Sequence, residues 1–116
     1  MLIDVRSPRF ELTPAIRRHV EQRVESSTGV ARRLIQRVSV TLDDVNAERG
    51  GQDKVCRIVA HCRGGASLVA EARHEDLYTA IDQAAEKARR EALREVHRAI
   101  TRERGSRQRP GVLVPA

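Results

Sequence analysis

Four basic residues recur at helical spacing in the C-terminal half of the chain, namely Lys87, Arg90, Arg94 and Arg98. At about 100° per residue, they fall within about 80° of one another on a helical wheel. Guanidinium and ammonium groups in such an array are the side chains that contact nucleic-acid phosphates. The same spacing also occurs on ordinary charged helices, where basic residues pair with acidic neighbours. The pattern therefore indicates either a phosphate-binding ridge or a plain solvated surface.

A second, shorter helix is expected near the N-terminus, and it carries Arg17, Arg18 and Arg23. The same two interpretations apply to these residues. The whole chain has 116 residues with 22 Lys+Arg against 16 Asp+Glu, a formal net charge of +6. All but two of the basic residues are arginine, which either phosphate binding or GC-rich coding would produce. The positive net charge of this small chain favours a polyanionic partner, and nucleic acid is the first candidate.

Aromatic side chains are scarce, because Phe10 and Tyr78 are the only ones in the chain. Proteins that read single-stranded RNA stack its bases on exposed aromatic rings. A sheet reader of single strands is therefore disfavoured. If RNA is the partner, recognition must rest on phosphates, shape and 2′-hydroxyl groups.

The sequence lacks the motifs of common enzymes: no G-x-S-x-G, P-loop, G-x-G-x-x-G or H-E-x-x-H occurs. The four histidines are spread along the chain without metal-ligand spacing, at His19, His61, His74 and His97. We therefore expect no enzymatic activity, no metal, no cofactor and no small-molecule substrate.

The two cysteines, Cys56 and Cys62, fall on one face of a predicted strand. Six residues of strand separate their Cα atoms by roughly 20 Å, far beyond the ~7 Å that a disulfide can bridge. No signal-peptide h-region follows Met1, and no apolar run approaches the roughly 18 residues of a membrane span. We expect buried, reduced thiols in a cytoplasmic protein without a membrane partner.

Hydrophobic periodicity predicts six elements. Thr13 and Pro14 supply a helix cap and a first helical residue, and Gly29 marks the end of that helix. Asp82 lies beside the apolar stripe of the second helix, where it is expected to act as a cap or to pair with Lys87 or another basic residue. The predicted elements are strand 2–6, helix 14–28, strands 34–43, 54–63 and 66–73, and helix 75–104.

The order of these elements is β-α-β-β-β-α, and each strand has one apolar and one polar face. A sheet of that kind is covered on one side only. The expected fold is an α+β two-layer sandwich, with a four-stranded sheet and two helices on one face, similar to double-stranded-RNA-binding domains. Residues 1–104 form the predicted domain. Residues 105–116 are rich in Gly, Pro and Arg, and a disordered tail is predicted there.

Two stretches carry a family resemblance: FELTPAIR at 10–17 and DLYTAID at 76–82, the latter followed by basic residues. With the element order, they make the chain resemble the ribosome hibernation-promoting factor family, also called ribosome-associated inhibitor A or the sigma-54 modulation protein family. The resemblance runs from about residue 2 to 98 and is to the short form of the family.

The resemblance implies a protein that binds the small ribosomal subunit and its rRNA near the decoding and tRNA channel. Such binding silences translation sterically under stress or in stationary phase. Lys87, Arg90 and Arg94 match the family's rRNA-facing positions on the second helix, and Arg17 matches one on the first. Arg23 and Arg98 extend the same faces. The expected state is a monomer.

Two other functions stay open at this stage. The first is a generic double-stranded RNA-binding module that recognises any A-form duplex by shape. The second is a protein-interaction regulator of transcription, which would need an exposed apolar patch. The outer face of the predicted sheet offers only scattered valines for that purpose, at Val55, Val59 and Val69.

Overall fold

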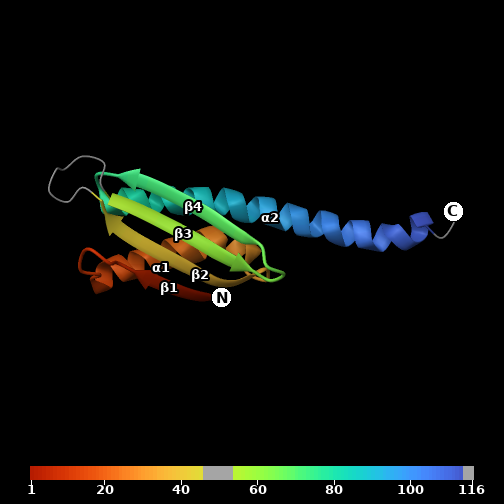
Figure 1. Cartoon of the computed structure of the whole chain (residues 1–116), viewed down its shortest axis with the longest axis horizontal. Coiled ribbons are helices and arrows are strands. Elements are labelled where there is room, and N and C mark those ends of the chain that lie inside the picture. The colour runs from red at the N-terminus through yellow and green to blue at the C-terminus, as the bar shows by residue number, and fades with distance from the viewer. Residues whose placement is uncertain (46–53, 114–116) are drawn as a thin grey trace.

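The computed structural model describes residues 1–45 and 54–113, with side chains described up to residue 104. A four-stranded sheet in the order β1-β2-β3-β4 has two helices packed on one face (Figure 1). β1 pairs with β2 in parallel, and the other two pairings are antiparallel. The elements are β1 (Leu2–Arg6), α1 (Pro14–Thr28), the 3-10 helix η1 (Gly29–Ala31), β2 (Ile35–Asp44), β3 (Lys54–Cys62), β4 (Ser67–His74) and α2 (Leu77–Leu113). The predicted fold class is confirmed.

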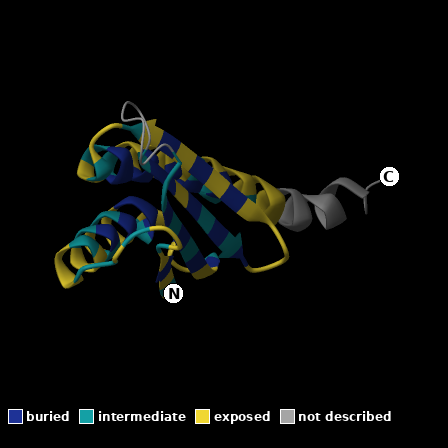
Figure 2. Ribbon diagram, turned by 60° about the vertical axis from the view of Figure 1, so that its left-hand side comes forward, coloured by how far each residue is buried: buried dark blue, intermediate teal, exposed yellow. Residues whose placement is uncertain are grey.

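The core lies between the sheet and the helices, and buried residues alternate with exposed ones along β4 and much of β2 and β3 (Figure 2). The α2 side of this core is built largely from alanine. Small side chains let the helix backbone approach the sheet closely, and interior packing then leaves little room for larger ones. The buried residues of α2 that face the core are Ala80, Ile81, Ala84, Ala85, Ala88 and Ala92.

Both long helices begin at a side-chain cap. Thr13 Oγ1 accepts a hydrogen bond of 3.2 Å from the Ile16 N–H, which confirms the predicted start of α1. At α2, Asp76 Oδ2 accepts 3.2 Å and 2.6 Å hydrogen bonds from the N–H and hydroxyl of Thr79. These bonds help to hold the pKa of Asp76 below its usual value. Because Asp76 is the cap, the helix begins at Leu77 rather than at the predicted residue 75.

A pair of glycines forms the turn between β3 and β4. Gly64 and Gly65 have φ angles of 87° and 97°, a region that residues with a Cβ rarely adopt. The Gly65 N–H donates to the Cys62 carbonyl at 3.2 Å, and the Cys62 N–H donates to the Ala66 carbonyl at 2.8 Å. The glycine pair therefore reverses the chain and sets the β3–β4 register.

α2 runs past the predicted end at residue 104 to Leu113, and its C-terminal part projects beyond the sheet (Figure 1). The predicted end relied on Gly105 as a terminator, but a single glycine costs a helix only about 1 kcal/mol. Residues 114–116 lie outside the described residues, and the disorder proposed for a tail over 105–116 stays a prediction. None of the described helices has the length and hydropathy that crossing a bilayer requires.

Candidate nucleic-acid interface

The structure brings three of the predicted basic residues together on the exposed side of α2. Lys87, Arg90 and Arg94 line one wall of a groove of about 270 Å³, and Val69 and Glu71 of the edge strand β4 line the other. We call Lys87, Arg90 and Arg94 the basic ridge. Their side chains come from successive turns of a helix whose opposite face is held by the alanine contacts to the sheet. The fold therefore presents these cations on a rigid support.

The three residues of the basic ridge differ in how far they are already engaged. The Lys87 ammonium donates a 2.8 Å hydrogen bond to the Glu71 carbonyl and so covers part of the open edge of β4. Arg94 Nη1 forms an ion pair of 2.7 Å with Glu91 on the next turn. Arg90 has no hydrogen bond or ion pair with any residue that the structure describes.

These contacts leave most of the donors on the basic ridge available. Lysine has three N–H donors and arginine has five. Lys87 uses one for Glu71, and Arg94 uses one for Glu91. A phosphate could therefore bind beside the existing contacts, and Arg90 could meet it without losing a partner.

Arg98 lies farther along α2 in a different environment. Its Nη1 is 3.0 Å from Glu95 Oε2, and Arg102 Nη2 is 3.0 Å from Glu95 Oε1. Glu95 is only 3% exposed, so both oxygens of a buried carboxylate are neutralised by these two arginines. The hydrogen bond from Arg102 is the main reason why the pKa of Glu95 is lowered despite burial.

The role of Glu95 was missed by the sequence reasoning, although a signal was present. On the helical wheel it falls within the apolar stripe of α2, close to the direction of Ala84, Ala88 and Ala92. A charged residue at such a position requires a partner when it is buried. The two arginines supply that partner, which makes Arg98 part of the fold as well as of the surface.

The two arginines of α1 that were predicted to contact rRNA, Arg17 and Arg23, also differ in their surroundings. Arg17 is exposed and has no ion pair among the described residues. Arg23 Nε lies 3.1 Å from Asp82 Oδ1 on α2. The same carboxylate oxygen is 2.8 Å from His19 Nε2. Asp82 thus pairs with a basic residue, as expected, but the partners come from α1, and the cluster ties the two helices together.

Tyr78 packs at the junction of the helices, where its ring lies edge-on to His19 with centroids 4.9 Å apart. The side chain remains 41% exposed. The ring contact joins α1 to α2. One edge-on tyrosine offers no row of rings on which successive bases could stack.

The remaining candidate groups are unsuited to covalent or metal chemistry. Cys56 and Cys62 are both buried, as predicted. Burial raises the pKa of Cys56 to about 12, and burial together with the charge of Glu95 raises that of Cys62. Both thiols are therefore protonated at neutral pH and poor nucleophiles. Within 1–45 and 54–104, no three His, Cys, Asp or Glu side chains converge as a metal site would require.

Comparison with known proteins gives consistent matches along most of the chain. The family model described as sigma 54 modulation protein / S30EA ribosomal protein matches residues 3–100. A ribosome hibernation promoting factor of Azotobacter vinelandii is 28% identical over 107 residues, which cover 92% of this chain and 94% of that protein.

Two solved structures have a similar fold. A ribosomal subunit interface protein from Coxiella burnetii superposes with a TM-score of 0.72 at 18% identity, covering 84% of this chain and 99% of that one. The N-terminal domain of Protein Y from Thermus thermophilus superposes with a TM-score of 0.63 at 26% identity, covering 81% of this chain and 98% of that one.

Proposed function

The chain belongs to the sigma 54 modulation protein / S30EA ribosomal protein family, and on that premise we propose that it binds the small ribosomal subunit through 16S-type rRNA near the decoding and tRNA channel. Occupation of that channel would silence translation sterically under stress or in stationary phase. No bond is made or broken in this mechanism. The family assignment agrees with the expectation that the protein is not an enzyme.

The observation that carries the proposal is the basic ridge on α2. Lys87, Arg90 and Arg94 are exposed, lie side by side and face a groove. Because Arg90 has no partner among the described residues and the other two retain free donors, the ridge can neutralise several phosphates at once. Its α2 segment lies inside the stretch that matches the family.

Arg17 on α1 is assigned a second rRNA contact, apart from the basic ridge, because it is also exposed and without an ion pair in the described part of the chain. Arg23 and Arg98 are assigned a smaller share of the binding. Each already holds a carboxylate, Asp82 and Glu95 respectively. A phosphate must share or displace that carboxylate, which reduces the net gain.

The proposal is tested by sedimenting the purified protein with separated small and large ribosomal subunits at low and moderate salt. We expect retention on the small subunit at both salt concentrations. An excess of a generic RNA duplex of about 16 base pairs, the span that duplex-binding domains cover, should not displace it. Displacement by the duplex would instead favour the generic double-stranded RNA module.

Chemical footprinting of the retained complex then locates the site. Protection of rRNA nucleotides that line the tRNA positions, together with loss of initiator-tRNA binding, is the expected result. Retention on the large subunit, or protection confined to the outer surface of the small subunit, would contradict the proposed mechanism.

A further inference from the structure

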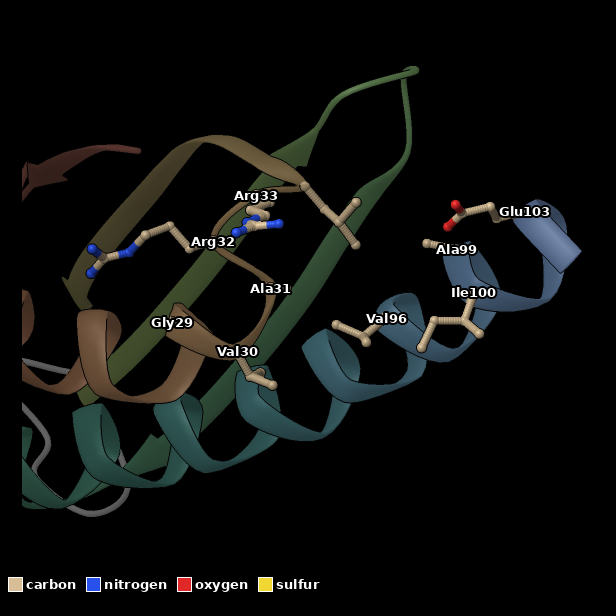
Figure 3. Close-up of a pocket in the computed structure, with 10 residues that line it drawn as sticks. Gly29, Val30, Ala31, Arg32, Arg33, Val96, Ala99, Ile100 and Glu103 are labelled. Carbon is tan, nitrogen blue, oxygen red and sulfur yellow. The ribbon is translucent and has the colours of Figure 1, made fainter.

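A second hollow, of about 580 Å³, lies between η1 and the C-terminal part of α2 (Figure 3). Val30 comes from η1, while Val96 and Ile100 come from successive turns of α2 (Figure 3). The hollow shares no lining residue with the groove along the basic ridge. We call it the η1–α2 groove, and the residues that matter here are Val30, Leu34, Val96, Ile100, Arg32 and Arg33.

The floor of the η1–α2 groove is apolar and accessible. Val30 is 45% exposed and Ile100 is 41% exposed, although most large apolar residues of the described chain are covered. Leu93, which is 36% exposed, lies about two turns before Ile100 on the same side of α2. An accessible apolar strip of this kind, rimmed by polar groups, is typical of surfaces that contact another protein.

The rim of the groove is positively charged. Arg32 and Arg33 line it, both are exposed, and neither has a carboxylate partner among the described residues. A third guanidinium stands beside them, because Arg63 Nε donates a 3.1 Å hydrogen bond to the Arg33 carbonyl. The only acidic residue that lines the groove is Glu103. The uncompensated charge of the rim therefore favours an anionic occupant.

We propose that the η1–α2 groove binds an amphipathic segment of a partner protein, with apolar side chains against Val30, Val96 and Ile100 and carboxylates against Arg33. The Arg32 guanidinium points away from Val96 and Ile100 (Figure 3) and adds to the positive charge around the groove. A second copy of this chain would bring a net charge of +6 to an already basic rim. An RNA strand would satisfy the arginines but leave the aliphatic floor without an apolar partner. An acidic, amphipathic segment satisfies both features of the groove.

The groove is separate from the basic ridge, although nine of its ten lining residues lie within the stretch that matches the family. The family match ends at residue 100, so Ile100 is its last residue and Glu103 lies beyond it. Because the groove and the basic ridge have no residue in common, the protein could hold a partner while the ridge is engaged with RNA.

The probe for the test is a labelled helical peptide of about 14 residues, or four turns, with leucine at i, i+3, i+4 and i+7 and glutamate elsewhere. It is titrated into the full-length ¹⁵N-labelled protein, and binding is followed by fluorescence anisotropy and amide shifts. We expect the amides of Val30, Ala31 and Ile100 to shift. A double Arg32→Glu, Arg33→Glu variant should bind at least about tenfold more weakly, a loss of about 1.4 kcal/mol.

The matched control is the Arg18→Glu, Arg89→Glu variant, which changes the net charge equally at two exposed helix positions outside the groove. It should bind the peptide about as the unmodified protein does. A second peptide with lysine in place of glutamate should not bind.

Several results would overturn the proposal. The first is that the groove amides do not shift at about 1 mM peptide, a concentration at which even weak binding is detected. The second is that the lysine peptide binds as well as the glutamate peptide. The third is that both double variants lose the same amount of affinity for the peptide. A single-stranded RNA that shifts the same amides at lower concentration would assign the groove to RNA. Concentration-dependent dimerisation that is lost in Ile100→Ser would assign it to a second copy. The assay contains no ribosome, so its failure leaves the ribosome proposal untouched.

Discussion

Removing the charge of the basic ridge while keeping polar side chains that suit a helix tests its assignment most directly. We consider the triple substitution of Lys87, Arg90 and Arg94 by Gln. Glutamine has nearly the same helix propensity as lysine and arginine, so α2 should keep its conformation. The three side chains are exposed. Exposed substitutions change the unfolding free energy by no more than about 0.5 kcal/mol each.

The expected loss of ribosome affinity follows from the contacts of each residue. Arg90 has no partner among the described residues, so its loss removes a full phosphate contact. Lys87 and Arg94 already donate to Glu71 and Glu91, so part of their capacity is in use. At about 1 kcal/mol for each solvent-exposed contact, the total is about 3 kcal/mol. That corresponds to roughly a hundredfold weaker binding.

The salt dependence of binding gives a second, independent measure. Each phosphate contact contributes about 0.7 to 0.9 to the slope of log affinity against log salt. Loss of three contacts should therefore flatten the slope by about 2 to 3. Both quantities come from titrating labelled protein with small ribosomal subunits at several KCl concentrations.

The control is a triple substitution of Arg6, Arg57 and Arg73 by Gln, which removes the same charge from exposed positions on the strands. It should keep affinity within a few-fold of the unmodified protein. Equal weakening in both triple variants would refute the assigned site, because net charge alone would then explain binding. Unchanged binding in the ridge variant would make the ridge an ordinary solvated surface, and loss of its fold would make it structural.

Four further outcomes are expected. Glu95→Gln should lower the unfolding free energy by about 1 kcal/mol at neutral pH, since both arginine partners are well exposed. The Arg102 hydrogen bond holds the pKa of Glu95 below its unfolded value. The contribution of ionised Glu95 to the unfolding free energy is therefore fully present above the unfolded glutamate pKa of about 4.3. Urea titrations should show this contribution vanishing as the pH falls through the lowered value. Gly29→Ala, at φ −57° and with open space around it, should stabilise by about 0.5 kcal/mol. Gly64→Ala, at φ 87°, should destabilise by about 1 kcal/mol in the same denaturation assay. Cys56, whose pKa is raised to about 12, should resist alkylation by iodoacetamide at pH 8 in the folded protein. The same thiol should react once urea unfolds the protein, because pH 8 lies only about half a unit below an ordinary thiol pKa.

The sequence was sufficient for the fold because its local signals agree with one another. Alternating strands, the Thr13 cap and the Gly64–Gly65 turn each specify one element, and the structure contains all of them. The start of α2 was misplaced because the helix was predicted to begin at residue 75, whereas Asp76 is its cap. Its end was misplaced because Gly105 was given more weight than one glycine has in a helix.

The candidate site was predictable only in part, since spacing gives the face of a helix but not what lies opposite. The wheel placed the basic ridge correctly on the exposed side of α2. It could not show that Asp82 reaches across to His19 and Arg23 on another helix. Nor could it show the η1–α2 groove, which depends on how η1 is set against α2.

The partners of the six predicted basic residues divide them into two groups with different physical roles. Arg23 neutralises Asp82 across the contact between α1 and α2, and Arg98 neutralises the buried Glu95 within α2. The other four residues do not bridge the two helices or neutralise a buried carboxylate in the described part of the chain. They are Arg17, Lys87, Arg90 and Arg94. A cation whose charge is already balanced by a neighbouring carboxylate adds little to the field that attracts a phosphate. The acidic residues of α2 therefore do not argue against RNA binding. Asp82 and Glu95 are neutralised by arginines that belong to the fold, whereas the basic ridge remains exposed beside β4.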